Sequence, residues 1–188
     1  MDLNAVVSLG LVAMVGIAAA TDIGHRKIPN VLTVTGFVFA LLVRGLIGFE
    51  ALIGGFLGAS IGFALFLPLF AVGGLGGGDV KLPTATGAFL GPKSLIVAVF
   101  ATVFIGAAMA VIAAARQRAL TSTLLGMRDL VVGLAQRAVL SKAGTELPTL
   151  DKPGGVRTPY GVAIAAGALI GLLWGDPIIA AVLGSPMT

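Results

Sequence analysis

Long segments without charged side chains constrain this chain more than any other feature. They cover residues 3–20, about 31–48 (with Arg44 as the exception), about 51–75, 94–115 and about 159–174. A helix needs about 20 consecutive apolar residues to cross a bilayer. Charged residues make up only 11% of the 188, whereas a soluble domain has about 25%. The sequence therefore predicts an all-α integral membrane protein and excludes a soluble globule.

One further apolar piece, residues 82–91, is too short to cross a hydrocarbon core of about 30 Å. We expect a short or tilted helix shielded by its neighbours, or a helix that starts inside the preceding glycine segment. Counting it gives about six transmembrane helices in a single polytopic domain, residues 1–188. Two glycine stripes with four-residue spacing, at 54/58/62 and 167/171/175, predict faces where helices pack closely.

The basic residues predict the orientation. Residues 3–20 resemble a secretory signal peptide, but Asp2 precedes them and the bases Arg26 and Lys27 follow, which favours a retained helix with its N-terminus outside. With six spans, ten of the 12 bases then fall on the cytoplasmic side, as the positive-inside rule requires. Arg44 falls near an outer end, where we expect its side chain to snorkel.

Residues 116–157 form the one long polar segment, predicted to be a basic cytoplasmic loop. Apolar residues recur in it at steps of four and three: Leu120, Leu124, Met127, Val131 and Leu134. This spacing predicts an amphipathic helix, either on the lipid surface or packed within a solvated loop. The net charge of +4 follows from the orientation bias, so we expect no nucleic-acid partner.

Two of the eight acidic residues, Asp22 and Asp79, stand in unusual local sequence. The other six fall at outer ends or in the polar segment, where solvent accommodates them. Asp22 and Asp79 both fall where a predicted helix meets the cytoplasmic interface, and an ionisable group beside a span is a functional candidate. Structural roles stay open for both, since an aspartate can cap a helix or pair with a nearby base.

A pair of carboxyl groups suggests a specific chemistry. Two carboxyls brought together share a proton, so one can take a proton from water while the other polarises a peptide carbonyl. This is aspartic-protease chemistry, and it needs no metal ion or cofactor. The chain has no cysteine, which excludes thiolate nucleophiles and thiolate metal sites. Gly76 and Gly78 would let a substrate backbone or a helix approach Asp79.

Three short segments resemble signatures of the type IV prepilin peptidase family. In the first signature, residues 22–30, an aspartate precedes Ile-Pro-Asn by six residues. The second signature, residues 76–81, reads Gly-Gly-Gly-Asp-Val-Lys and is similar to the family's Gly-x-Gly-Asp element. The third signature, residues 157–161, contains Pro-Tyr-Gly and resembles the element that opens the family's last helix. The resemblance covers about residues 18–175.

The resemblance implies a multi-pass aspartic endopeptidase of the bacterial cytoplasmic (inner) membrane, with its active site facing the cytoplasm. It implies that Asp22 and Asp79 are the catalytic pair and that a prepilin-like membrane protein is the substrate, cut before its hydrophobic helix. Longer members carry paired cysteines in a cytoplasmic segment and also methylate the new N-terminus. Here the first cytoplasmic turn has ten residues and no cysteine. We therefore expect no methyltransferase activity and a short form like the tight-adherence (Flp) pilus peptidases.

Several residues near the aspartates are candidates for supporting roles. Gly76, Gly78 and Lys81 are candidates for binding substrate or tuning the aspartate pair, although Lys81 can equally be a lysine snorkelling at the interface. His25 is interpreted as part of the basic turn. Pro29, Asn30, Pro159 and Gly161 are expected to shape helix starts rather than to do chemistry.

Two other functions use the same carboxylates. A small proton-coupled transporter would need charges buried in mid-span, and the sequence places almost none there. A presenilin-like protease, which cuts within the bilayer, shares the Gly-x-Gly-Asp element. Asp22, however, belongs to a basic turn followed by Ile-Pro-Asn, which fits the prepilin peptidases. Homo-oligomerisation is left open.

Overall fold

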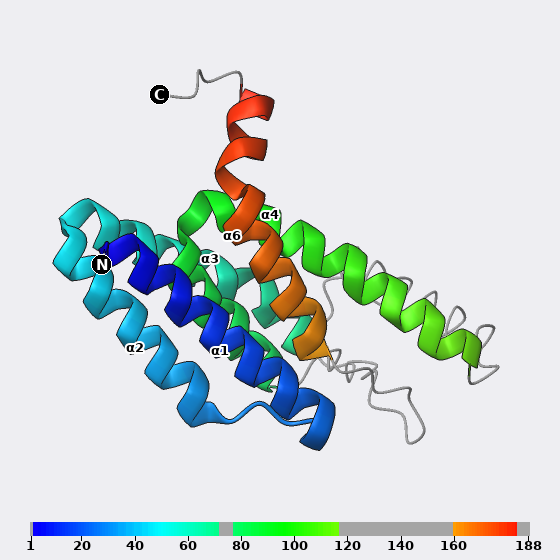
Figure 1. Cartoon of the computed structure of the whole chain (residues 1–188). Coiled ribbons are helices and arrows are strands. Elements are labelled where there is room, and N and C mark those ends of the chain that lie inside the picture. The colour runs from blue at the N-terminus through cyan, green and yellow to red at the C-terminus, as the bar shows by residue number, and fades with distance from the viewer. Residues whose placement is uncertain (1, 72–76, 117–159, 184–188) are drawn as a thin grey trace, which may run out of the picture.

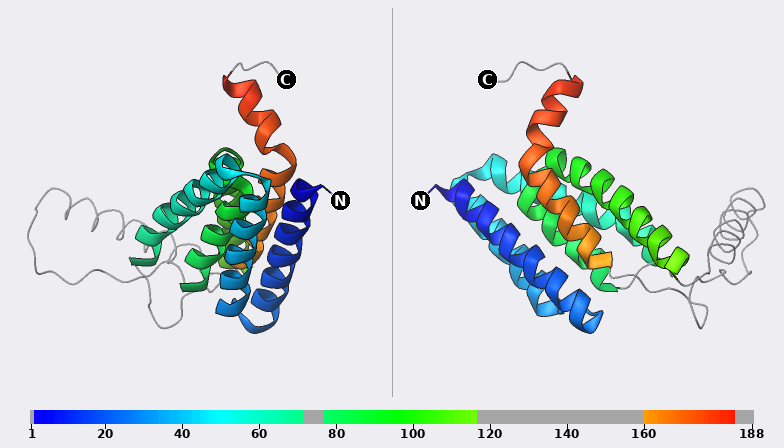
Figure 2. Two further views of the ribbon diagram at one scale, coloured as in Figure 1. Left: turned by 90° about the vertical axis from the view of Figure 1, so that its left-hand side faces the viewer. Right: turned by 45° about the vertical axis from the view of Figure 1, so that its right-hand side comes forward.

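The computed structural model describes residues 2–71, 77–116 and 160–183. In these ranges the chain forms helices and no strand, so the all-α prediction is confirmed. The elements are α1 (Leu3–His25), α2 (Asn30–Ile47), α3 (Phe49–Ala71), α4 (Gly77–Arg116) and α6 (Tyr160–Leu183). Figures 1 and 2 show them gathered in one bundle. The amphipathic helix predicted within 116–157 lies outside the described residues.

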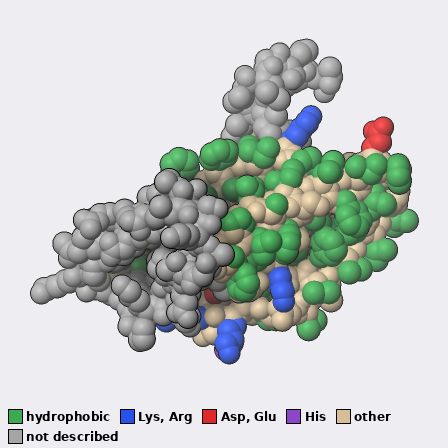
Figure 3. All heavy atoms as spheres, turned by 180° about the vertical axis from the view of Figure 1, so that it is seen from behind, with side chains coloured by type: hydrophobic (Ala, Val, Ile, Leu, Met, Phe, Trp, Pro, Cys, Tyr) green, Lys and Arg blue, Asp and Glu red, His purple; other side chains and the backbone are tan. Residues whose placement is uncertain are grey.

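The bundle carries the apolar surface of a membrane protein. α1, α2, α3 and α4 are each long and apolar enough to cross a bilayer, and the apolar part of α6, Tyr160–Gly175, is shorter. Large hydrophobic side chains point outward, including Leu46 at 74% exposure and Phe104 at 73%. Figure 3 shows such side chains covering most of the described surface on one face. The count of six spans and the direction of insertion stay predictions.

α4 bends sharply at Gly91, whose backbone is non-helical (φ 75°, ψ 176°). Glycine adopts a positive φ readily, and a residue that precedes a proline, here Pro92, is disfavoured in the helical region. The first part of α4 begins at Gly77, which agrees with a helix that starts inside the glycine segment. The second part folds back beside the first, so one element supplies two helical arms.

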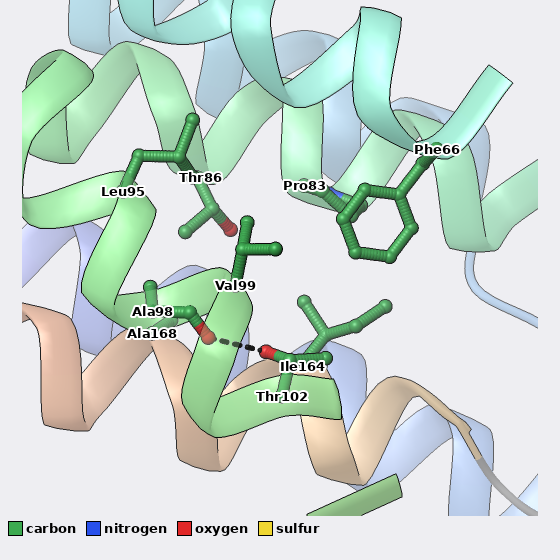
Figure 4. Close-up of a pocket in the computed structure, with 9 residues that line it drawn as sticks. All are labelled: Phe66, Pro83, Thr86, Leu95, Ala98, Val99, Thr102, Ile164 and Ala168. Atoms are coloured by element: carbon green, nitrogen blue, oxygen red, sulfur yellow. Dashed lines mark hydrogen bonds between the residues drawn. The ribbon is translucent and has the colours of Figure 1, made fainter. Parts of the chain in front are cut away.

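The two arms of α4 enclose a small cavity of about 10 Å³ together with α3 and α6. Figure 4 shows Thr86 of the first arm across from Thr102 of the second. The Thr102 hydroxyl donates to the Ala98 carbonyl, while the buried Thr86 hydroxyl has no hydrogen-bond partner in the described part of the chain. The volume suits about one water molecule, and neither Asp22 nor Asp79 lines it.

Arg44 corrects one expectation, because its side chain turns inward instead of snorkelling to the interface. Its Nη2 donates to the Phe89 carbonyl (2.6 Å) and its Nη1 to the Ala51 carbonyl (3.1 Å). The bend at Gly91 ends the first arm of α4, and the last carbonyls of a helix have no partner within it. A cation at a helix C-terminus is also electrostatically favourable. Arg44 therefore ties α2 to α3 and to the bend.

The glycine stripes pack as predicted. A Cβ atom at Gly58 would collide with the Gly87 carbonyl, and one at Gly62 would lie 2.5 Å from the Pro83 carbonyl oxygen. A Cβ at Gly171 would lie 2.7 Å from that of Ala98. Small residues at such positions let helix backbones approach closely. They hold both arms of α4 between α3 and α6, which fixes the start of α4 near the start of α6.

Candidate active site

Asp22 lies inside a helix rather than in the predicted turn. α1 continues through His25, and it ends at Arg26, which has a left-handed backbone (φ 51°) and donates its N–H to the Asp22 carbonyl. The Asp22 side chain is only 6% exposed. The helix extends further than the polar sequence indicated, and in its last turn Asp22 is buried while Ile23, Gly24 and His25 are exposed. The carboxyl group thus starts from a rigid backbone and points into the bundle.

The carboxyl group of Asp22 meets the start of α6. The backbone N–H of Gly161 donates a hydrogen bond of 2.7 Å to Asp22 Oδ2. The first N–H groups of a helix have no partner within the helix, so this amide is available to a side chain. A Cβ at position 161 would lie 2.8 Å from Asp22 Oδ2 and 3.1 Å from Cγ. Glycine is therefore required for this close approach.

Asp79 is placed by the first turn of α4 and is half-buried. Its negative charge acts on the phenol of Tyr160, the residue immediately before Gly161. The Tyr160 ring lies over Gly106 of the second α4 arm, where a Cβ would come within 2.8 Å of the ring carbon Cε2. The start of α6 thus bonds to Asp22 through Gly161 and lies within the electrostatic influence of Asp79 at Tyr160.

The first and second signatures also touch directly. A Cβ at Gly78 would lie 3.2 Å from that of Ile28, so these residues are in close contact. Lys81 Nζ, although exposed, donates a hydrogen bond of 3.0 Å to Asn30 Oδ1. These contacts hold the connection between α1 and α2 against the first turns of α4. The described residues of the three signatures therefore meet at one end of the bundle (Figure 1).

The remaining assignments have different outcomes. His25 is exposed beside the basic turn, and Gly76 lies outside the described residues. Pro29, Asn30 and Gly161 lie at the starts of α2 and α6, as predicted, and Pro159 lies outside the described residues. Sequence reasoning missed that Asn30 and Gly161 also bond to signature residues. The sequence clue to these bonds was that both residues belong to the signatures.

The catalytic role of Asp22 and Asp79 and the roles of Gly78 and Lys81 stay predictions.

The described residues contain no group of three or more His, Asp and Glu side chains that could hold a metal ion. What the arrangement offers chemically is a buried carboxyl with a fixed orientation, a second carboxyl at the same end of the bundle, and a phenol on which the charge of the second carboxyl acts. Carboxyl groups gathered in this way can exchange protons with a water molecule and a peptide carbonyl.

Comparison with known proteins identifies the family. The type IV leader peptidase family matches residues 9–111, a range that includes both aspartates. The prepilin leader peptidase/N-methyltransferase of Bacillus subtilis (strain 168) is 34% identical over 172 residues, which are 89% of this chain and 55% of that protein. The chain thus spans about half the length of this relative. No solved structure matches the chain. By the family match, this chain belongs to the type IV leader peptidase family.

Proposed function

We propose that this protein is a membrane aspartic endopeptidase that removes the leader peptide of prepilin-like substrates, with Asp22 and Asp79 as the catalytic pair. One observation carries the proposal: two signatures supply one aspartate each, at the end of α1 and the start of α4, and the start of α6 holds the first of them through the Gly161 N–H. Placing a carboxylate at the edge of the membrane costs free energy, so its presence there supports a functional role. The family supports peptide hydrolysis as that role.

The proposed reaction uses one shared proton and one water molecule. One carboxylate takes a proton from the water, whose oxygen bonds to the carbon of the scissile carbonyl, while the other carboxyl gives its proton to the carbonyl oxygen. The tetrahedral intermediate then loses its C–N bond as the leaving nitrogen takes up the proton abstracted from water, and one hydroxyl of the intermediate returns a proton to the carboxylate that had acted as the acid. The products are a leader with a free carboxyl end and a pilin with a free amino end.

The proposed site faces the cytoplasm of a bacterial inner membrane. The exposed bases Arg26, Lys27 and Lys81 lie at the aspartate end of the bundle, and basic residues gather on the cytoplasmic side of membrane proteins. The bend at Gly91 lies at the opposite end, where Arg44 binds it. A prepilin whose hydrophobic helix lies in the bilayer would present its leader junction at the aspartate end.

The substrate is proposed to be a tight-adherence (Flp) type prepilin, and no methyl transfer is proposed. The B. subtilis relative carries both activities in its name. In this chain the α1–α2 connection is short and the sequence has no cysteine, unlike the longer members with paired cysteines. The observations favour the peptidase over a transporter because the structure places both aspartates at helix ends rather than in mid-span.

Single substitutions test the proposal. Asp22→Asn and Asp79→Asn should each lower leader cleavage by at least about 1,000-fold, because each removes one member of a unit that exchanges protons. Glu50→Gln is the matched control, since Glu50 is an exposed acid in the first turn of α3. Purified variants are compared in bilayers with a prepilin and with a helical transmembrane peptide as substrates. Wild-type cleavage by either aspartate variant would overturn the proposal.

Two other outcomes favour the alternatives. Faster cleavage of the transmembrane peptide than of the prepilin would indicate a presenilin-like protease. A transporter would be indicated if the wild-type protein catalyses proton-linked uptake into vesicles, both aspartate variants abolish that uptake, and neither peptide is cleaved.

A further inference from the structure

We propose that Gly161 is a positioning residue whose backbone N–H fixes Asp22 so that Oδ1 of Asp22 is the atom that takes the proton from water, and Asp79 carries the shared proton. This inference rests on the proposed function. It assigns different tasks to two carboxyls that the signatures leave equivalent, and it gives the Pro-Tyr-Gly element a task beyond starting a helix.

The hydrogen bond itself determines where a proton can sit on Asp22. An amide N–H can only donate, and it lies 2.7 Å from Oδ2. Oδ2 must therefore offer a lone pair in this bond, and any proton that Asp22 carries belongs on Oδ1. A donor of this kind binds a charged oxygen more strongly than a neutral one, which suits a carboxylate that starts the reaction as the base.

The surroundings of Asp22 prevent its carboxyl from turning. The side chain is 6% exposed, and the Gly161 backbone lies so close that an added Cβ would come within 3.1 Å of both Cβ and Cγ of Asp22. α1 and α6 supply the two partners, and groups carried on helices are held more precisely than groups on loops. With Oδ2 held by Gly161, Oδ1 is the oxygen left to meet a water molecule.

The task of Asp79 follows from that of Asp22. The Gly161 amide requires an accepting oxygen on Asp22 and binds the ionised form more strongly. When the pair shares one proton, that proton therefore lies on Asp79, which delivers it to the scissile carbonyl while Asp22 Oδ1 takes one from water.

The decisive variant removes the amide hydrogen without adding atoms. Cell-free translation with a tRNA carrying glycolic acid replaces Gly161 by an ester unit, which keeps the shape and loses the N–H. The same replacement at Gly167, in the interior of the same helix, is the matched control. We expect kcat for prepilin cleavage to fall roughly 10- to 100-fold in the Gly161 ester, with KM within about threefold because the ester removes no leader contact. The Gly167 ester should keep kcat within about threefold.

The pH profile separates positioning from general loss of structure. The Gly161 N–H stabilises the form of the aspartate pair in which the base is ionised. The ester removes this N–H, so the acidic limb of the pH profile of kcat should move to higher pH in the Gly161 ester. A protein that is merely less well folded would lose amplitude at every pH without moving the limb. An unchanged limb and an unchanged kcat would overturn the proposal.

A conventional substitution gives a second test. Gly161→Ala places a Cβ 2.8 Å from Asp22 Oδ2, whereas Gly24, on the same helix as Asp22, has nothing within 4 Å of an added Cβ. Gly161→Ala should lower kcat about 100-fold, since small displacements of a catalytic group are costly, and Gly24→Ala should leave kcat within about twofold. Equal kcat values for the two variants would overturn the inference. If the aspartate variants are inactive but the Gly161 variants cleave at the wild-type rate, only this inference is overturned. If the aspartate variants are active, the proposed function is overturned.

Discussion

Lys81 donates a 3.0 Å hydrogen bond to the side-chain oxygen of Asn30, and this bond joins the second turn of α4 to the first residue of α2. The two residues are 51 positions apart in the sequence. The bond belongs to the set of contacts by which the first and second signatures meet. It gives Lys81 a structural partner that competes with a role in binding substrate.

The Lys81–Asn30 pair can be tested by a double-mutant cycle. Lys81→Met and Asn30→Ala should each lower kcat/KM about three- to tenfold, because each loosens the α1–α2 connection, and the double variant should be no worse than either single one. The free energy of unfolding should change by less than about 1 kcal/mol, since the bond is exposed. A rise in KM for Lys81→Met alone would show instead that Lys81 binds substrate charge.

Gly78 allows the second signature to pack against the first. Gly78→Ala places a Cβ 3.2 Å from Ile28 Cβ, while Gly77→Ala meets only Phe70 at 3.9 Å. We expect Gly78→Ala to cost about 1 kcal/mol of stability through overpacking and to lower cleavage several-fold, and Gly77→Ala to do neither. Thermal unfolding in detergent and cleavage assays check this. Restoration by Ile28→Gly in the Gly78→Ala background, which removes the contacted Cβ, would identify the steric cause.

Tyr160 should affect catalysis through its hydroxyl group and its position. Tyr160→Phe keeps the ring over Gly106 and removes the hydroxyl on which the charge of Asp79 acts, so kcat should fall roughly tenfold with little change in stability. Gly106→Ala brings a Cβ within 2.8 Å of the ring and should lower kcat by displacing Tyr160. Steady-state cleavage kinetics measure both. If Tyr160→Phe retains full kcat, the phenol has no part in the reaction.

Arg44 should contribute to stability rather than to activity. Arg44→Met leaves the carbonyls of Phe89 and Ala51 without their donor and should cost about 1–3 kcal/mol. Arg44→Lys should recover only part of this loss, because an ammonium group does not span two acceptors as a guanidinium does. Lys93→Met, which changes an exposed base, is the control. Thermal unfolding gives the order of stabilities, and cleavage per folded enzyme should stay near wild type.

Several features of this protein were predictable from local sequence. The uncharged segments predicted a helical membrane protein because charge is excluded from the bilayer core whatever the tertiary arrangement. The stripes at 54/58/62 and 167/171/175 predicted close packing because glycine spacing alone defines a smooth helix face. Asp22 and Asp79 stood out by the signatures around them.

Other features followed only from three-dimensional packing. Arg44 turns inward because the bend at Gly91 leaves the Phe89 carbonyl without a partner in its own helix. The sequence of α2 gives no sign that this bend lies next to Arg44. Asp22 is buried because the start of α6 meets its carboxyl group.

The sequence by itself determined the class of protein, its helical segments and the two candidate carboxyl groups, since these depend on local hydrophobicity and on short motifs. The tertiary structure decided which residues meet the carboxyls. Gly161 lies 139 positions from Asp22 in the sequence, and no local pattern specifies a contact across such a separation. That contact exists because glycine faces draw α6 and α4 together until the unpaired amide at the start of α6 reaches the carboxyl at the end of α1.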